Sequence, residues 1–213
     1  DSTDSTDGRT GGPTSGRAAV TGVRLADGTS VPAQLVVVGI GVAPNTDWLE
    51  PAPGGSAGVT LDNGVVVDAT LAAAPGVVAA GDIARWPSAR YGEELRVEHW
   101  EHAIQMGEHA GRTLLAHLAG TPEAAEPFDP VPFFWSDMFD RKIQLVGRSG
   151  PDHDVEVVIG STEERRFVAL YGRAGRVEGV LGWNRPRHVM LLRPLVEESV
   201  AWDEGIERAR ALA

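Results

Sequence analysis

The chain has 213 residues, of which 42% are hydrophobic, and it has no cysteine and a formal net charge of −11. The absence of cysteine excludes disulfides, thiolate metal sites and cysteine-pair redox chemistry, and the acidic balance argues against broad nucleic-acid binding. No apolar run approaches the roughly 20 residues of a membrane-spanning helix, and the first residues lack the basic flank and apolar stretch of a signal peptide, so we expect a globular protein of the cytoplasm without a membrane partner.

The first part of the chain predicts a polar end, a hairpin and a buried strand. Residues 1–17 contain no large apolar side chain, so burial cannot offset the cost of ordering them, and we expect a loop or ragged end. Residues 20–25 alternate apolar with polar or small side chains before a turn at 26–29, which predicts a β-hairpin. The β-branched run at 35–38 predicts a strand covered on both faces of a sheet.

Short strands and one long helix are predicted next. A Gly- and Pro-rich loop at 51–58 leads to valine-rich segments at 65–67 and 77–80, which favour strands. From residue 99 to 118, apolar and small residues recur at helical spacing with charged residues between them. The residues of this helical pattern are Ala103, Met106, Ala110, Leu114 and Leu118.

The last part predicts a small antiparallel sheet after a linker at 121–130. Four apolar segments predict its strands, and they cover residues 143–146, 155–159, 167–171 and 177–181. The turn at 172–175 joins two of them as a hairpin. We expect Asn184 to cap a helix near 185–200 with Pro186 in its first turn, and Pro194 to kink or break that helix.

Gly81-Asp82, at the end of the strand predicted at 77–80, is the most informative dipeptide. A missing side chain at Gly81 lets the backbone approach a ligand, and the Asp82 carboxylate can bind a ligand hydroxyl. The alternative is that Asp82 is an ordinary helix cap or turn acid.

Glu98, His99 and Trp100 stand directly at the start of the predicted helix. The unpaired N–H groups and the positive dipole end of a helix start favour an electron-rich group, such as the pyrimidine side of a reduced flavin. The alternative is that His99 and Trp100 are a packed aromatic pair at a domain seam.

Gly39, Ile40 and Gly41 follow the strand predicted at 35–38. Pro44 occupies the place of the third glycine in the G-x-G-x-x-G pattern, so this segment is not a Rossmann entry loop. It is read as the end of a strand leaving a sheet, and contact with a ligand stays open.

Four motifs in this order and spacing resemble flavin-dependent ferredoxin reductases of the pyridine-nucleotide oxidoreductase superfamily. They are Gly-Ile-Gly-Val-Ala-Pro-Asn at 39–45, Ala-Ala-Gly-Asp-Ile-Ala at 79–84, Arg-Val-Glu-His-Trp at 96–100 and Phe-Phe-Trp-Ser-Asp-Met-Phe-Asp at 133–140. The resemblance implies an oxidoreductase that transfers hydride from NADH or NADPH to FAD and then single electrons to a ferredoxin- or rubredoxin-type iron–sulfur protein. It leaves open the choice of NADH or NADPH, the identity of the acceptor and the oligomeric state.

The resemblance also implies roles for single residues. Asp82 would bind a ribitol hydroxyl of FAD, with Gly81 giving the clearance. Glu98, His99 and Trp100 would lie beside the isoalloxazine, largely through backbone atoms. Since hydride transfer demands positioning of two cofactors, no catalytic acid, base or nucleophile and no metal ligand is expected.

Two further sites follow from the same resemblance. Gly39, Ile40 and Gly41 would lie near the nicotinamide half of NAD(P)H. Trp135 would be the aromatic residue near the flavin on the C-terminal domain, and the alternative is a core tryptophan of that domain. Because ferredoxins are usually acidic, a basic docking patch on this domain is also expected, and its candidates are Arg141, Arg148, Arg173 and Arg176.

The expected fold class is α/β: the C-terminal part of a flavoprotein with two dinucleotide-binding domains, followed by a small α+β domain. Residues 18–43 would end an NAD(P)H-binding domain, 44–120 would be the second segment of an FAD domain, and 128–213 the C-terminal reductase domain. The glycine-rich loops that bind the pyrophosphates of FAD and NAD(P)H do not occur in this sequence, so the chain alone is expected to bind FAD weakly or not at all. The alternative function is a non-catalytic remnant or interaction module that keeps only partner docking.

Overall fold

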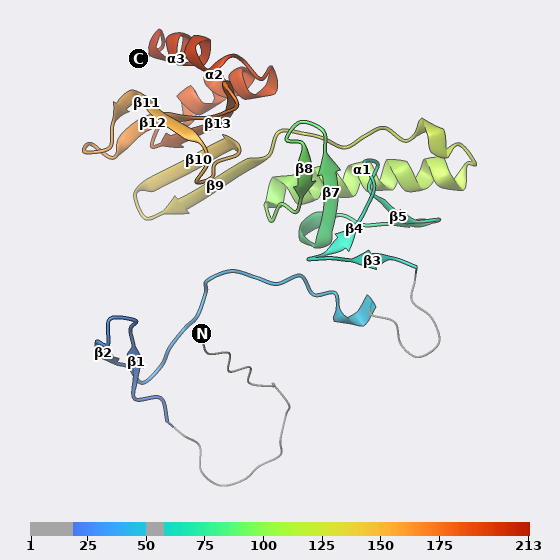
Figure 1. The fold of residues 1–213 in the computed structure, drawn as a ribbon, viewed down its shortest axis with the longest axis horizontal. Helices are drawn as coiled ribbons and strands as arrows, with labels where there is room; N and C mark the ends of the chain where they lie inside the picture. Colours follow the sequence, from blue (N-terminus) through green and yellow to red (C-terminus); the bar gives the residue numbers. More distant parts are fainter. Residues whose placement is uncertain (1–18, 50–57) are drawn as a thin grey trace. The chain divides into compact units, whose positions relative to one another are not determined.

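A computed structural model describes residues 19–49 and 58–213 of the chain, which divides into a unit of residues 1–42 and a unit of residues 43–213 (Figure 1). The loop predicted at 1–17 lies outside the described residues, and so does the loop predicted at 51–58 except for its last glycine.

The predicted hairpin is confirmed in the first unit. Strands β1 (Gly22–Arg24) and β2 (Ser30–Pro32) pair antiparallel. The turn between them is fixed by the Asp27 carboxylate, which accepts a hydrogen bond from the Thr29 N–H at 2.8 Å. An Asp side chain that bonds its own backbone two residues on is a common turn stabiliser.

The buried strand predicted at 35–38 is wrong for this structure. No strand is assigned there, and Leu35 and Val37 are 80% and 86% exposed. A central strand needs neighbours for its N–H and C=O groups. In the described residues, no strand pairs with this segment, so its apolar side chains have no partner surface.

Two small sheets form the middle of the chain. The first has the order β3-β4-β7-β8, with β4 and β7 parallel and the other neighbours antiparallel, and the second consists of β5 and β6. The strands are β3 (Thr60–Leu61), β4 (Val65–Val66), β5 (Ala72–Ala74), β6 (Val77–Val78), β7 (Ala84–Ser88) and β8 (Glu93–Leu95), with short 3-10 helices η1 (Asp47–Leu49) and η2 (Gly81–Ile83). The strands predicted at 65–67 and 77–80 are therefore confirmed in their first two residues.

Helix α1 (Trp100–Leu118) confirms the predicted long helix. Its inner face buries His102, Met106, Ala110 and Thr113. Met106 belongs to a core that also contains Leu71 and Trp86, both fully buried. This core holds α1 against the strands of the middle part.

The C-terminal part is the predicted antiparallel sheet, extended by one strand that was not predicted. Its order is β11-β12-β13-β10-β9, and all neighbours are antiparallel. The strands are β9 (Phe133–Met138), β10 (Arg141–Gly147), β11 (Asp154–Ser161), β12 (Arg166–Arg173) and β13 (Arg176–Trp183). Ala174 and Gly175 turn between β12 and β13 with φ of 52° and 74°, the positive values that a two-residue hairpin turn favours. The linker before this sheet contains only the 3-10 helix η3 (Pro122–Ala124).

Helices α2 (Pro186–Glu197) and α3 (Trp202–Arg210) close the sheet. Asn184 does not cap α2: its φ is positive, its carbonyl oxygen Oδ1 accepts a hydrogen bond from the Lys142 N–H at 2.8 Å, and Arg185 stands at the N-cap position. Pro186 begins the helix as predicted, but α2 continues through Pro194 instead of breaking there. The second helix α3 was not predicted.

The two helices share one core with the sheet (Figure 1). Glycines let them approach: a Cβ on Gly182 would lie 2.2 Å from Val189 of α2, and one on Gly172 would lie 2.4 Å from the Trp202 ring of α3. The C-terminal part therefore has two layers, the β-sheet and the two helices, packed around one core.

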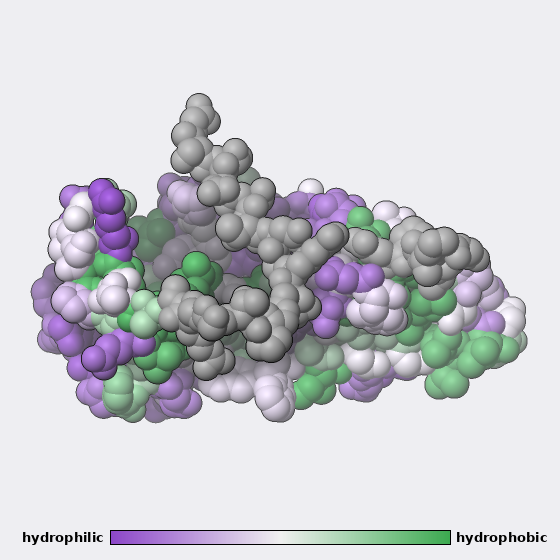
Figure 2. Space-filling model, turned by 90° about the horizontal axis from the view of Figure 1, so that it is seen from below, coloured by the Kyte–Doolittle hydropathy of each residue, from purple (hydrophilic) through white to green (hydrophobic). Residues whose placement is uncertain are grey.

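Several large apolar side chains stay exposed, and Figure 2 shows hydrophobic residues at separate places on the face that it presents. Within residues 19–49 and 58–213, no helix is long and apolar enough to cross a membrane. The same residues contain no group of His, Cys, Asp and Glu that could hold a metal ion.

Candidate functional site

A depression of about 510 Å³ opens between the start of α1 and the edge of the C-terminal sheet. One wall is the segment from β8 to α1, and the other comes from β9, β10 and the residues next to them. The lining residues are Arg96, Val97, Glu98, His99, Pro132, Phe134, Leu145, Gly147, Arg148 and Ser149. The site thus joins two of the motifs singled out in the sequence.

The start of α1 offers free hydrogen-bond donors. His99 is the N-cap residue in extended conformation, with φ −116°, and its side chain makes no capping hydrogen bond. The first N–H groups of an α-helix have no partner within the helix, so a ligand with acceptor atoms can bind there. Trp100, the first residue of α1, is 76% exposed.

His99 lines the depression where its two walls meet, because its ring packs against Phe134 of the other wall. Its ring centroid lies 5.2 Å from that of Phe134, and its Nδ1 atom is buried with no hydrogen-bond partner among residues 19–49 and 58–213. Burial lowers the pKa of His99, although the negative charges of Asp82 and Glu98 oppose the shift. The ring is therefore neutral at neutral pH.

Arg96 belongs to the Arg-Val-Glu-His-Trp motif, but no role of its own was predicted for it from the sequence. Its Nη1 atom pairs with the Glu98 carboxylate at 2.5 Å and donates to the Asp82 carbonyl oxygen at 3.1 Å. Its Nη2 atom donates to Asn63 Oδ1 at 3.3 Å. Because Arg96 bonds to Glu98 in its own segment and to two separate segments, at Asp82 and Asn63, it fixes Glu98 and η2 relative to each other.

Gly81 and Asp82 lie in η2, in contact with α1. Gly81 has φ +77°, and a Cβ added to it would meet Ala103 of α1 at 3.7 Å. The Asp82 side chain is exposed and has no hydrogen-bond partner among residues 19–49 and 58–213. Ala80 and His99 occupy the N-cap positions of η2 and α1, so Asp82 caps neither helix.

Phe134 and Trp135 point to opposite faces of β9, as successive strand residues do. Phe134 lines the depression, whereas Trp135 stacks on Phe133 with ring centroids 5.7 Å apart and an interplanar angle of 26°. Trp135 is 41% exposed and is not a buried core residue. The described contacts bring Phe134 to His99, and a role of Trp135 near a flavin stays a prediction.

Gly39, Ile40 and Gly41 belong to the unit of residues 1–42, which is described by itself. All three are exposed, and Ile40 is 92% exposed. Their place near a nicotinamide stays a prediction.

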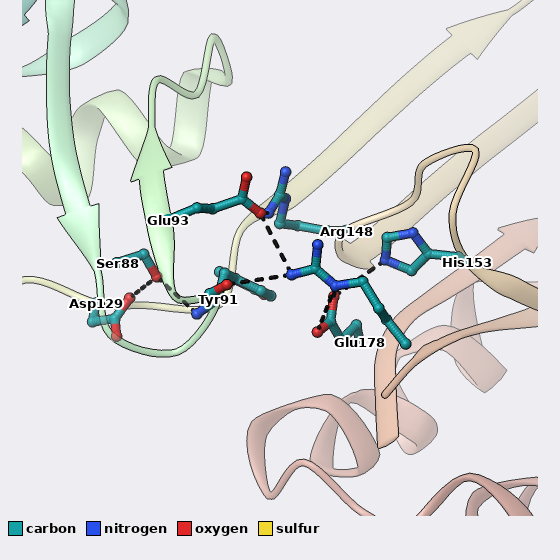
Figure 3. Close-up of polar contacts among 8 residues, drawn as sticks. Ser88, Tyr91, Glu93, Asp129, Arg148, His153 and Glu178 are labelled. Atoms are coloured by element: carbon teal, nitrogen blue, oxygen red, sulfur yellow. Dashed lines mark hydrogen bonds and ion pairs between the residues drawn. The ribbon is translucent and has the colours of Figure 1, made fainter. Parts of the chain in front are cut away.

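A seam of polar contacts holds the two walls together (Figure 3). We use the word seam for two sets of contacts: those of residues 88–90 with Asp129, and those of residues 90–93 with the C-terminal part. Glu93 of β8 pairs with Arg148, and Arg173 lies 3.5 Å from Glu93 and 3.3 Å from Glu178. The Arg148 guanidinium also stacks over the Tyr91 ring at 5.2 Å.

The seam engages side chains that were expected to form a basic docking patch. Arg148 and Arg173 are bonded within it, Arg141 pairs with Asp140 at 3.2 Å, and Arg176 donates to the Ser199 carbonyl oxygen at 2.8 Å. The four arginines therefore do not form one free basic patch. Counting arginines missed this because Glu93, which engages Arg148 and Arg173, lies in a distant segment, and because the partner of Arg176 is a backbone carbonyl.

The residues present fit the flavin end of FAD. The uncapped start of α1 can donate to electron-rich carbonyl and ring atoms, the free Asp82 carboxylate can accept from a hydroxyl, and Phe134 supplies an apolar wall. The pyrophosphate has no corresponding loop, because no G-x-G-x-x-G pattern occurs in the sequence.

Comparisons with known proteins give the family of the chain. The family model described as pyridine nucleotide-disulphide oxidoreductase matches residues 8–107, and the one described as reductase C-terminal matches residues 133–208. The chain is 39% identical over 184 residues to the 5,5'-dehydrodivanillate O-demethylase ferredoxin reductase subunit of Sphingobium sp., with 86% of this chain and 42% of the relative covered. It is 31% identical to putidaredoxin reductase CamA of Pseudomonas putida, with 91% and 44% covered.

Solved structures give the same picture. The ferredoxin reductase for the CYP199A2 system from Rhodopseudomonas palustris superposes with a TM-score of 0.73 at 36% identity, covering 92% of this chain and 45% of that one. The covalent putidaredoxin reductase–putidaredoxin complex gives a TM-score of 0.68 at 29% identity, with 88% and 44% covered. The chain thus spans less than half the length of these relatives.

Proposed function

The chain belongs to the family of FAD-dependent NAD(P)H ferredoxin reductases, and we propose that it forms the flavin-facing and acceptor-facing part of such an enzyme. In this proposal, electrons pass from NAD(P)H through FAD to a ferredoxin-type iron–sulfur protein in the cytoplasm. The observation that carries the proposal is the depression in which the uncapped start of α1 faces Phe134 of the C-terminal sheet.

Each residue of the depression has a positioning task in this proposal. The Asp82 carboxylate accepts a hydrogen bond from a ribitol hydroxyl, and the first N–H groups of α1 bind the electron-rich side of the isoalloxazine. His99 is neutral because burial lowers its pKa, so it adds no positive charge of its own beside the ring. When bound, FAD accepts a hydride from NAD(P)H and releases electrons one at a time.

The C-terminal sheet has a different task. Phe134 and Leu145 cover the site on the side opposite α1 and limit the access of water to it. Trp135 lies on the other face of the same strand, next to Phe133, and is 41% exposed, so it is available to a docked acceptor. That a ferredoxin-type protein docks here is supported by the solved complex of putidaredoxin reductase with putidaredoxin, to which the chain is similar.

The alternative function, an interaction module without flavin chemistry, makes a different use of the same surface. It requires the C-terminal sheet and its helices but gives Asp82, His99 and the start of α1 no task. The Asp82 carboxylate, which is exposed and has no hydrogen-bond partner in the part of the chain that the structure describes, favours the flavin proposal.

A chimera tests the proposal. This chain replaces the matched part of the Sphingobium ferredoxin reductase subunit, so that the remainder of the relative supplies the glycine-rich loops. The purified chimera should contain about one FAD per chain and reduce a [2Fe–2S] ferredoxin with NADH or NADPH. A folded chimera that binds no flavin, or binds it without reducing any ferredoxin, would show that the proposal is wrong and favour the interaction module.

A further inference from the structure

A second cavity, of about 90 Å³, lies at the seam. The loop between β7 and β8 contributes Arg90 and Tyr91 to its lining, and the segments from β12 to β13 and around the end of α2 contribute the rest. None of its lining residues also lines the candidate site. This cavity, which we call the arginine cavity, is therefore separate from the proposed flavin site.

Three arginines line the arginine cavity, and two of them have no carboxylate partner in the part of the chain that the structure describes. Arg173 lies 3.3 Å from Glu178. Arg90 donates instead to the backbone carbonyl oxygens of residues 196 and 197, at 3.2 and 3.0 Å. Arg176 donates to the carbonyl oxygen of residue 199 at 2.8 Å. Among the described residues, the positive charges of Arg90 and Arg176 are therefore not neutralised by an ion pair.

Arg90 and Arg176 also have donor groups to spare. A guanidinium group has five N–H donors, and both arginines use only Nη1 for their bonds with described residues. Two positive charges at one small cavity repel each other, most strongly where little water screens them. An anion between them would remove this repulsion and accept the remaining hydrogen bonds, because guanidinium groups bind oxyanions through pairs of N–H groups.

Tyr91 adds a neutral donor to the same lining. The residue is 6% exposed, and its hydroxyl oxygen is buried with no hydrogen-bond partner among residues 19–49 and 58–213. Burial raises the pKa of Tyr91 to about 12, although the positive charge of Arg90 opposes the shift, so the hydroxyl keeps its proton. Such a hydroxyl needs an acceptor, because buried polar groups in proteins are nearly always hydrogen-bonded.

The acids near the arginine cavity are already compensated. Glu178 lines it, but its carboxylate lies 3.3 Å from Arg173 and 3.2 Å from the Nε2 atom of His153 (Figure 3). Asp129, whose charge also acts on Tyr91, accepts hydrogen bonds from two residues of the seam. The groups left to bind a ligand are therefore donors, and two of them are positively charged.

We propose that the arginine cavity binds a small tetrahedral oxyanion, inorganic phosphate or sulfate, between Arg90, Arg176 and the hydroxyl of Tyr91. Its volume exceeds what one water molecule needs, but it is well below the roughly 300–1,000 Å³ of sites for cofactors and drug-sized ligands, which favours a free ion. Arg90 belongs to the middle part and Arg176 to the C-terminal part, so the bound ion joins the two cores. The site rests on these contacts and not on the proposed flavin chemistry.

Calorimetric titration of the full chain with inorganic phosphate tests the proposal, in Tris–chloride buffer with the ionic strength held constant. Wild type should bind one phosphate per chain, and sulfate should compete for the same site. At ten times the Kd, phosphate should raise the thermal midpoint by about 3–5 °C. Because both ions also stabilise proteins by exclusion from the surface, the decisive quantity is the difference between wild type and variants.

Four variants separate the site from this general effect. Arg90→Gln and Arg176→Gln remove a charge but keep N–H donors for the carbonyl oxygens, and each should weaken phosphate binding at least tenfold. Tyr91→Phe should be at least as stable as wild type without phosphate, because it removes a buried hydroxyl that lacks a partner, yet it should bind phosphate about tenfold more weakly. Arg187→Gln is the matched control, since it removes an exposed positive charge of α2 outside the cavity and should bind like wild type.

Three results overturn the proposal. Wild type binds neither phosphate nor sulfate, or Arg90→Gln, Arg176→Gln and Tyr91→Phe bind phosphate as well as wild type, or Arg187→Gln weakens binding as much as Arg176→Gln does. Phosphoethanolamine, which carries the same group as an ester, is the last probe and should bind more weakly than free phosphate. An ester that binds as tightly would identify the ligand as the phosphate group of a larger molecule and overturn the assignment to a free ion.

Discussion

Glu93 of β8 and Arg148, the residue after β10, form an ion pair that joins the two cores of residues 43–213 (Figure 3). They are 55 residues apart in the sequence. Arg148 also lines the candidate site, so this pair connects the position of the C-terminal sheet to the shape of the depression. Arg90 adds a second link, because its Nη1 atom donates to the carbonyl oxygens of Val196 and Glu197 at the end of α2.

Glu93→Gln should weaken the attachment of the C-terminal part. The substitution leaves Arg148 and Arg173 without their shared carboxylate, and we expect the free energy of unfolding to fall by about 0.5–1 kcal/mol, a small value because Glu93 is partly exposed. Urea denaturation followed by tryptophan fluorescence measures the change. In 1 M salt the difference from wild type should shrink, since screening weakens the wild-type pair.

Glu94→Gln is the control for this prediction. Glu94 lies next in β8 and pairs with Arg85 at 2.8 Å, within the middle part. A Glu94 variant should not alter the attachment of the C-terminal sheet. If both variants lose the same free energy of unfolding and each still unfolds in a single transition, the Glu93 pair has no special part in joining the two cores.

The pH dependence of the Glu93 pair follows from its pKa. The hydrogen bond from Arg148 lowers the pKa of Glu93 below its ordinary value of 4.5, more than burial raises it. The stabilisation is therefore present above pH 4.5 and is lost as the pH falls through the lowered pKa of the folded state. The wild-type chain and Glu93→Gln should differ in stability at pH 7 and converge in strong acid.

His102 should make the stability of the fold sensitive to acid at a higher pH than Glu93 does. It is 1% exposed, packs against Trp86 at 4.8 Å and Phe128 at 5.2 Å, and burial lowers its pKa from 6.5 to about 4. Above pH 6.5 the ring is neutral in both states. As the pH falls from 6.5 to 4, the unfolded chain binds a proton that the folded chain does not, so stability should fall by up to about 3 kcal/mol.

His102→Phe checks this prediction through a slope. Phenylalanine keeps an aromatic ring in the same place but cannot bind a proton, so the stability of the variant should change less between pH 6.5 and 4 than that of wild type. Denaturation midpoints at half-unit pH steps measure both slopes. Identical slopes would show that protonation of His102 does not oppose folding.

The sequence predicted the elements whose signals are local. The helix at 99–118 was readable from its spacing, and the strands and the tight turn of the C-terminal sheet were readable from their β-branched runs and Gly175. In the candidate site, the Gly-Asp and Glu-His-Trp motifs also stood out, because each combines groups that can bind a ligand with the end of one element or the start of another. Periodicity within a segment needs no knowledge of what packs against it.

Features that depend on distant partners were not predictable. The run at 35–38 reads as a central strand but has no neighbour in the described residues, and Asn184 reads as a cap but bonds to Lys142, 42 residues earlier. Arg96 looks ordinary until its three partners are brought together. For the same reason, composition could not show that Arg148 is engaged by Glu93.

Asp82→Ala in the chimera should reduce the retention of FAD. A hydrogen bond from a hydroxyl to a carboxylate contributes roughly 1.5–3 kcal/mol, so we expect affinity to fall by about tenfold or more. Dialysis followed by the ratio of flavin to protein absorbance measures the loss. Asp152→Ala, which removes an exposed carboxylate between β10 and β11, is the control. If Asp82→Ala holds its flavin as tightly as Asp152→Ala does, Asp82 does not bind the ribitol.

The opposite faces of β9 predict that its two neighbouring aromatic residues act on different steps. Trp135 lies on the face away from the depression, so Trp135→Ala in the chimera should slow delivery of electrons to the ferredoxin more than reduction of the flavin by NAD(P)H. Phe134 packs against His99 inside the depression, so Phe134→Ala should instead disturb flavin retention or the reductive step. Stopped-flow absorbance at the flavin band measures the two half-reactions separately. Each variant is the control for the other. If the two variants slow both half-reactions equally, β9 acts only through packing. If Trp135→Ala has the rates of wild type in both half-reactions, the Trp135 side chain has no part in electron transfer.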